Sequence, residues 1–236
     1  MKPALTHRHA LFLDLDGTLL DLALTPADVE VPPGLGSLLT GLAAQRNGAL
    51  AILSGRTLVD IDAVTGAILP AGAEHGFLLR DATGTITRPV AQSANRPEWC
   101  AALEQAALAM PGVAIELKTY TLVAHFRQAP ERGPELRAMI EAMITGDPSV
   151  ELLGAHMAWE IRPKGAGKGS ALHWFMRHRP FADKIPVFVG DDVTDEAAID
   201  AAKALGGIGL HVARDFGGET KSVRAWLNEV RMNGEG

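Results

Sequence analysis

Two aspartates directly follow the first apolar segment of the chain. Asp14 and Asp16 come after Leu11-Phe12-Leu13, and Gly17-Thr18-Leu19 follows them. An apolar run of this length predicts a buried strand, and the glycine permits a sharp turn at its exit. Open α/β sheets build their sites at the carboxyl ends of such strands. Because two carboxylates this close repel unless a cation joins them or one keeps a proton, the segment predicts a magnesium-dependent site for phosphoryl transfer.

The same two aspartates suit two different chemical roles. The carboxylate of Asp14 could attack phosphorus and form an aspartyl-phosphate, which divides a hydrolysis into two easier steps. If the chain turns right after the strand, Asp16 could protonate the leaving oxygen and then take a proton from water. The alternative is an acid pair that caps a turn. The apolar strand before the pair and the Gly-Thr-Leu after it favour catalysis.

A second acidic group follows another apolar run, Val187-Phe188-Val189. Mg²⁺ prefers oxygen ligands and retains several waters. We therefore expect Asp14, Asp191 and the backbone carbonyl of Asp16 to be metal ligands. Two further aspartates, Asp192 and Asp195, are expected behind them as outer ligands or as groups that orient water and a lysine. An acidic helix N-terminus is the alternative; it accounts for Asp195 and Glu196 but not for Asp191-Asp192 at a strand end.

An anion site is predicted where Ser54-Gly55-Arg56 ends another apolar run. A hydroxyl and free N–H groups at the start of a helix can hold phosphate oxygens, so Ser54, Gly55 and Arg56 are candidate substrate-binding residues. The alternative is that Ser54 only caps the helix.

Residues 162–169 form a glycine-rich basic loop before the helix expected at 169–177. We expect a lysine of this loop to neutralise the phosphate and keep Asp14 ionised. The loop lacks the spacing of a Walker A motif. Lys164 and Lys168 compete for this role. We favour Lys168, because Gly169 and Ser170 immediately open the helix; the alternative is that both lysines lie in a solvated loop.

The order of the expected elements indicates an α/β core interrupted by an α+β insert. The core strands are expected at residues 10–14, 49–53, 69–73, 186–189 and 208–212. The core helices are expected at 33–45, 57–64, 169–177, 195–204 and 222–230, with a loop at 213–219. The insert is expected to contain helices 97–110 and 134–144, a hairpin of strands 113–118 and 122–127, and a second hairpin of strands 150–153 and 157–162 around residues 154–156. The domains are therefore 1–91, 92–162 and 163–236.

Composition narrows the classes of partner and location. The 236-residue chain is 47% apolar, carries a net charge of −6 and has no long basic block, so nucleic acid is not an expected partner. No apolar run approaches the roughly 18 residues of a membrane helix, and the N-terminus does not resemble a signal peptide. A single cysteine, Cys100, suits a reducing compartment. We expect a cytoplasmic protein.

The four motifs occur in the order typical of the haloacid dehalogenase (HAD) superfamily, and the chain resembles that superfamily from Asp14 to Asp195. Gly190-Asp191-Asp192-Val193-Thr194-Asp195, Ala73-Glu74-His75-Gly76 and Glu160-Ile161-Arg162-Pro163 resemble trehalose-6-phosphate phosphatases more narrowly. The resemblance implies a Rossmann-like parallel-sheet core, an inserted C2-type cap and Mg²⁺. It also implies a sugar-phosphate substrate and a possible functional link to a trehalose-6-phosphate synthase.

The resemblance extends to the insert, which offers Glu116-Leu117-Lys118 and His125-Phe126-Arg127. It implies that Glu116, Lys118 and Glu160 hold the sugar ring far from the phosphate. The alternative is that Glu116 and Lys118 form a solvent-facing ion pair.

Other functions stay open at this stage. Phosphatases of sucrose phosphate or mannosylglycerate phosphate, a phosphomutase, and a non-catalytic sugar-phosphate sensor are the alternatives, although the intact acidic and basic motifs argue against a sensor.

Overall fold

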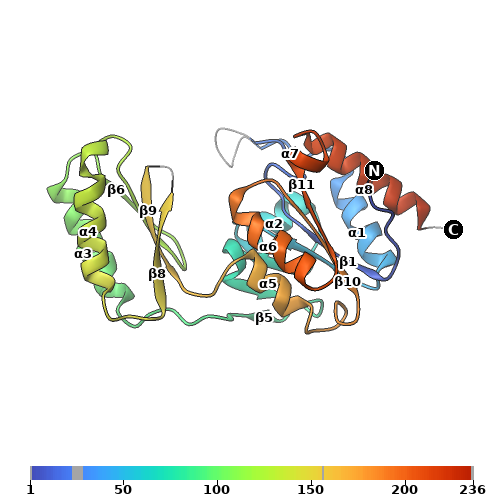
Figure 1. The fold of residues 1–236 in the computed structure, drawn as a ribbon, viewed down its shortest axis with the longest axis horizontal. Helices are drawn as coiled ribbons and strands as arrows, with labels where there is room; N and C mark the ends of the chain where they lie inside the picture. The colour runs from blue at the N-terminus through green and yellow to red at the C-terminus, as the bar shows by residue number, and fades with distance from the viewer. Residues whose placement is uncertain (1, 23–28, 156, 235–236) are drawn as a thin grey trace. The chain divides into compact units, whose positions relative to one another are not determined.

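The chain folds as two compact units in a computed structural model that describes residues 2–22, 29–155 and 157–234. One unit combines Met1–Pro89 with Ala166–Gly236, and the other is Val90–Gly165; the sequence predicts an insert at 92–162. We call these units the core and the cap (Figure 1). Within the described residues, no helix has the length and apolar character needed to cross a membrane.

A seven-stranded sheet forms the centre of the core, in the order β11-β10-β1-β2-β3-β4-β5. The first five strands of that order are parallel, and β4 and β5 extend the sheet antiparallel. The strands are β1 (His9–Leu13), β2 (Leu50–Leu53), β3 (Ala71–Ala73), β4 (Leu78–Arg80), β5 (Ile86–Thr87), β10 (Ile185–Gly190) and β11 (Ile208–His211).

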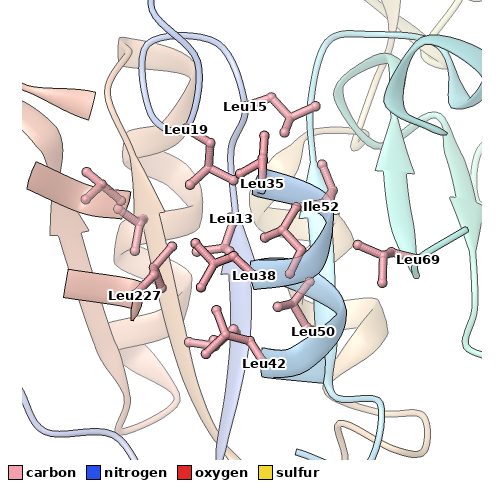
Figure 2. Packing of buried hydrophobic residues seen from close by; sticks show 14 of the residues in the cluster. Leu13, Leu15, Leu19, Leu35, Leu38, Leu42, Leu50, Ile52, Leu69 and Leu227 are labelled. Atoms are coloured by element: carbon pink, nitrogen blue, oxygen red, sulfur yellow. The ribbon is translucent and has the colours of Figure 1, made fainter. Parts of the chain in front are cut away.

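Helices cover both faces of this sheet because the parallel strands are apolar on both sides. Along β1, Leu11 and Leu13 face one hydrophobic cluster, whereas Ala10 and Phe12 face the other. The first cluster packs α1 (Leu35–Gln45), α2 (Leu58–Thr65) and α8 (Thr220–Asn233) on the sheet. Figure 2 shows its leucines interdigitating between α1 and the strands. The second cluster packs α5 (Lys168–Phe175) and α6 (Val193–Ala204).

The cap is an antiparallel sheet in the order β6-β7-β9-β8, with both of its α-helices packed on one face. Its elements are α3 (Arg96–Ala109), β6 (Ala114–Leu117), β7 (Leu122–His125), a 3₁₀ turn at Pro130–Arg132, α4 (Gly133–Ile144), β8 (Val150–Ala155) and β9 (Ala158–Pro163). Trp99 and Leu103 of α3 share a hydrophobic cluster with Leu136 and Ile140 of α4 over this face. The α+β class predicted for the insert is confirmed.

Some predicted elements were wrong or missing. The predicted loop at 213–219 begins as a helical turn, α7 (Val212–Asp215), because the His211 ring accepts the N–H of Ala213 and Asp215 accepts the N–H of His211. The hairpin β4–β5 was not predicted, since its strands are only three and two residues long. In the cap, β8 runs on through 154–155, where a turn was expected, and residue 156 of that turn lies outside the described residues.

Candidate active site

Parallel pairing brings the predicted motifs to one edge of the core sheet. Leu13 of β1 lies beside Val189 of β10 and Ile52 of β2. The residues that follow these strands are Asp14, Asp191 and Ser54, so all three emerge at the carboxyl edge, where the helices begin.

Lys168 joins two acids at this edge. Its Nζ lies 2.7 Å from Asp14 Oδ1 and 2.6 Å from Asp195 Oδ1, and all three side chains are at most 5% exposed. Burial alone lowers the pKa of Lys168, but the two carboxylates raise it above its ordinary value, so the lysine stays charged. Lys168 is the first residue of α5 rather than a loop residue ahead of it. Its predicted competitor, Lys164, is exposed in the cap.

The acids outnumber the cations in this cluster. Oxygens of Asp14, Asp191 and Asp195 all lie within 4.8 Å of one another. Burial raises the pKa of Asp14 to about 7, against the opposing effect of Lys168, and burial and Asp195 raise that of Asp191. Three carboxylates around one ammonium leave negative charge uncompensated, and hard oxygen donors are what Mg²⁺ prefers. The residues therefore fit a divalent cation between Asp14 and Asp191.

Thr18 and Gly17 shape this acidic pair in ways that the sequence did not reveal. The fully buried Thr18 hydroxyl lies 3.1 Å from Asp14 Oδ2 and 3.4 Å from Asp191 Oδ1, so it can donate to either carboxylate. Gly17 has a φ of 79°, and a Cβ there would lie only 2.0 Å from Asp191 Oδ2. A glycine is needed both for the turn and for the close approach of Asp191.

Arg56 contacts Asp16 in this structure. Its Nε and Nη2 donate to the two carboxylate oxygens of Asp16 at 2.7 and 2.6 Å. A guanidinium matches a carboxylate in this two-bond geometry, and the hydrogen bonds to Asp16 raise the pKa of Arg56 further. The predicted acid/base and a predicted phosphate ligand therefore form an ion pair, which the sequence did not predict.

Ser54 lies buried at the end of β2, with 1% of its surface exposed. Its hydroxyl oxygen accepts the N–H of Arg56 at 3.2 Å, which makes Ser54-Gly55-Arg56 a tight turn. The helix that follows is capped by Thr57, whose hydroxyl oxygen accepts the N–H of Asp60. Ser54 is therefore not the capping residue of α2.

Asp192 and Asp195 organise the start of α6. Asp192 caps the helix and accepts the N–H of Val193 at 2.6 Å, while its side chain faces solvent. Asp195 Oδ2 accepts the N–H groups of Asp191 and Asp192 at 3.0 and 3.2 Å, and its other oxygen pairs with Lys168. Contrary to the expectation from the sequence, Asp192 is the residue that caps the helix, while Asp195 links the N-terminus of α6 to Lys168.

The predicted sugar-binding residues lie on the cap, on the sheet face opposite its helices. Pairing places Glu116, Val123 and Glu160 in one row across β6, β7 and β9, so their side chains share a face. Glu116 lies 3.7 Å from Lys118 Nζ and 3.1 Å from His125 Nε2. These three side chains are 42–49% exposed. The ion pair considered from the sequence is present, and His125 adds a second partner for Glu116.

Known proteins resemble this chain over nearly its whole length. The family described as trehalose-phosphatase matches residues 12–229. A probable trehalose-phosphate phosphatase of Sinorhizobium fredii is 40% identical, over 86% of this chain and 77% of its own length. The trehalose-6-phosphate phosphatase of Escherichia coli is 33% identical, over 89% and 79%. A crystal structure of Aspergillus fumigatus trehalose-6-phosphate phosphatase shares the fold, with a TM-score of 0.72, 24% identity, and coverage of 99% of this chain and 100% of that one.

Proposed function

The chain belongs to the trehalose-phosphatase family, and from that premise we propose that it hydrolyses trehalose 6-phosphate to trehalose and phosphate. The observation that carries the proposal is the buried arrangement of Asp14, Lys168 and Asp195 beside Asp191. A solvated acid pair at a turn would not bury a lysine between two carboxylates. A buried lysine between two carboxylates suits a reaction in which a negatively charged phosphate binds and charge shifts between its oxygens and the enzyme.

Asp14 is the proposed nucleophile. Its carboxylate oxygen attacks phosphorus, the bond from phosphorus to the sugar oxygen breaks, and an aspartyl-phosphate forms. Lys168, 2.7 Å from Asp14, favours the ionised nucleophile and offsets the charge of the incoming phosphate. Ser54, Gly55 and Arg56 are proposed to hold the phosphate oxygens, since they form the turn at the end of the neighbouring strand.

Asp16 is the proposed acid and base. It gives a proton to the departing sugar oxygen, then takes one from the water that attacks the aspartyl-phosphate, which regenerates Asp14 and releases phosphate. In the structure both oxygens of Asp16 are held by Arg56. Arg56 must therefore release at least one of them before Asp16 can act. We propose that the substrate phosphate binds the guanidinium of Arg56 in place of Asp16.

Mg²⁺ is the proposed cofactor, with Asp14, Asp191 and the backbone carbonyl of Asp16 as its protein ligands. When bound it would supply positive charge that offsets the carboxylates and polarises the phosphoryl group. Asp195 keeps Lys168 in place and accepts the N–H of Asp191, so it is proposed to support the ligands from behind.

The cap is the proposed source of sugar specificity. The core motifs reach only the phosphate and the reacting oxygen. On the cap, Glu116, Lys118 and Glu160 present charged groups on the sheet face that the helices leave open. Charged groups bind sugar hydroxyls strongly when partly desolvated. A cytoplasmic location and a functional link to a trehalose-6-phosphate synthase complete the proposal, in line with a phosphorylated disaccharide as substrate.

A phosphate-release screen tests this function. The chain is incubated with trehalose 6-phosphate, sucrose 6-phosphate, mannosylglycerate phosphate and glucose 6-phosphate, with Mg²⁺ and with a chelator in its place. We expect the highest kcat/KM for trehalose 6-phosphate and no release with the chelator. Faster release from another sugar phosphate would assign that substrate instead. Phosphate migration without release would indicate a mutase, and binding without either would indicate a sensor.

A further inference from the structure

A left-handed turn follows β3, beside the turn formed by Ser54-Gly55-Arg56. Three successive residues have positive φ values: 48° at Glu74, 59° at His75 and 95° at Gly76. L-residues with side chains rarely adopt this conformation, and two in succession are rarer still. Strain of this kind persists only where the surroundings hold it, and it gathers at functional sites.

The left-handed turn directs two backbone N–H groups at the neighbouring turn. The N–H of Glu74 donates to the carbonyl of Arg56, and that of His75 donates to the carbonyl of Ser54, both at 2.9 Å. The two carbonyls flank Gly55. If β3 continued as an ordinary extended strand, successive N–H groups would point to opposite sides of the strand. The left-handed backbone instead lets the N–H groups of Glu74 and His75 both bind the same neighbouring turn.

The His75 ring fills the space beside Gly55. A Cβ built on Gly55 would lie 2.6 Å from Nε2 and 2.7 Å from Cε1 of His75, and the third nearest atom, at 3.5 Å, is Cδ2 of the same ring. The ring is thus the nearest obstacle to a side chain at Gly55. Two hydrogen bonds and one ring contact hold the turn from the β3 side.

We infer that Glu74 and His75 are positioning residues for phosphate binding, which act through Ser54-Gly55-Arg56. The inference rests on the proposed function in assigning phosphate to that turn. Because Arg56 in turn binds both carboxylate oxygens of Asp16, the left-handed turn also helps to fix the position of the Asp16 side chain. This role differs from that of a core histidine, because loss of the His75 side chain should weaken phosphate binding and not only lower the stability of the fold.

A double-mutant cycle between Gly55→Ala and His75→Asn tests the inference. Asparagine tolerates a left-handed backbone but lacks the outer ring atoms that would meet a Cβ on Gly55. The readouts are the affinity of the Mg²⁺-loaded chain for inorganic phosphate, by calorimetry, and the free energy of unfolding in urea. His75→Asn should weaken phosphate binding about tenfold, since misplacement by an ångström can cost more than that in a well-ordered site.

Gly55→Ala alone should weaken phosphate binding more than His75→Asn, because the new methyl group displaces either the ring or the turn. In the His75→Asn background the same change should have little further effect, so the two effects should not add. The matched control is Asn47→Ala, which changes another left-handed residue, at the opposite end of β2. It should lower stability without changing phosphate affinity.

Three results would overturn the inference. These are His75→Asn with phosphate affinity within about twofold of wild type, additive effects in the cycle, or wild-type chain that binds no phosphate. A chain that binds phosphate and shows the coupling, yet does not hydrolyse trehalose 6-phosphate, would contradict the proposed function and leave the positioning role of His75 in place.

Discussion

The charged groups of the core and those of the cap are held in opposite ways. In the core, Asp14 and Lys168 are about 95% buried, and the lysine lies within 2.7 Å of two carboxylates. In the cap, Glu116 and Lys118 are nearly half exposed and 3.7 Å apart. A buried group with fixed partners needs little reorganisation when charge moves. An exposed pair is worth only about 0–1 kcal/mol, so a ligand hydroxyl can replace it at little cost.

The comparison suggests that the core and the cap have different roles, the core in turnover and the cap in the choice of substrate. Each proposed reacting group of the core has a partner that fixes it: Thr18 and Lys168 for Asp14, Arg56 for Asp16. On the charged face of the cap, Glu116 pairs with Lys118 and His125 of its own sheet. We therefore expect core substitutions to reduce turnover of every phosphate ester, and cap substitutions to change the choice among them.

The largest effect is expected for Asp14→Asn. The amide has nearly the same shape but cannot attack phosphorus, so kcat should fall by about 10⁴-fold or more. Stopped assays with the sugar phosphate and with p-nitrophenyl phosphate measure the loss, and circular dichroism checks the fold. A folded variant that turns over either substrate near the wild-type rate would remove Asp14 from the role of nucleophile.

Asp16→Asn should have the next largest effect, and the effect should depend on the leaving group. Loss of an acid/base lowers rates by about 10²- to 10⁴-fold. The sugar phosphate should lose more than p-nitrophenyl phosphate, whose leaving group needs no proton. Equal losses on both substrates, where attack or departure limits both rates, would instead make Asp16 the structural partner of Arg56.

Metal binding should stabilise the chain more as the pH rises. Burial raises the pKa of Asp14 from 3.8 to about 7, so the folded metal-free chain holds this proton more tightly than the unfolded chain. The stability from the proton is present below pH 3.8 and is lost as the pH rises through about 7. Mg²⁺ competes with the proton for Asp14, so the ion should bind more tightly as the proton is lost. At a concentration a hundred times its Kd, Mg²⁺ should add about 2.7 kcal/mol to the free energy of unfolding.

Urea unfolding at about pH 5.5 and about pH 8, with Mg²⁺ or with a chelator, measures this exchange. Asp191→Asn removes one proposed ligand and should abolish most of the gain at the higher pH. An equal gain from Mg²⁺ at both pH values would place the ion away from Asp14.

The smallest effect is expected in the cap, and it should be selective. Glu116→Ala and Glu160→Ala should each lower kcat/KM for trehalose 6-phosphate about tenfold to a hundredfold, from the loss of a charged hydrogen bond worth roughly 1.5–3 kcal/mol. p-Nitrophenyl phosphate should be almost unaffected. Glu141→Ala is the matched control, because Glu141 forms a similarly exposed pair with Arg137 on α4. Equal losses on both substrates would contradict the division between core and cap.

Much of the core could be predicted because its signals are local. The apolar runs before Asp14 and Asp191 specify buried strands, and the alternation with helices specifies a parallel sheet. Parallel pairing then brings both acids to one edge without further information. In the cap, two hairpins and two helices were also readable, because turn residues and apolar periodicity act over a few positions.

Only the tertiary structure could decide which side chains meet. Lys168 and Asp14 are separated by 154 positions, and Arg56 and Asp16 by 40. Nothing in the local pattern showed that Arg56 holds Asp16, that His75 fills the space beside Gly55, or that His125 is a second partner of Glu116 beside Lys118. The short strands β4 and β5 carry too few residues for a periodic signal.

The sequence by itself determined most of the elements, the edge of the sheet where the core strands end, and the kinds of groups gathered there. Local backbone preferences and apolar spacing are properties of neighbouring residues, so they can be read along the chain. The sequence also predicted that Lys168 would act on Asp14, whereas the pairing Asp16–Arg56 and the left-handed turn at Glu74–His75 were decided only by the tertiary structure. The physical reason is that burial, charge and packing act between segments that are far apart in the sequence and meet only in the folded chain.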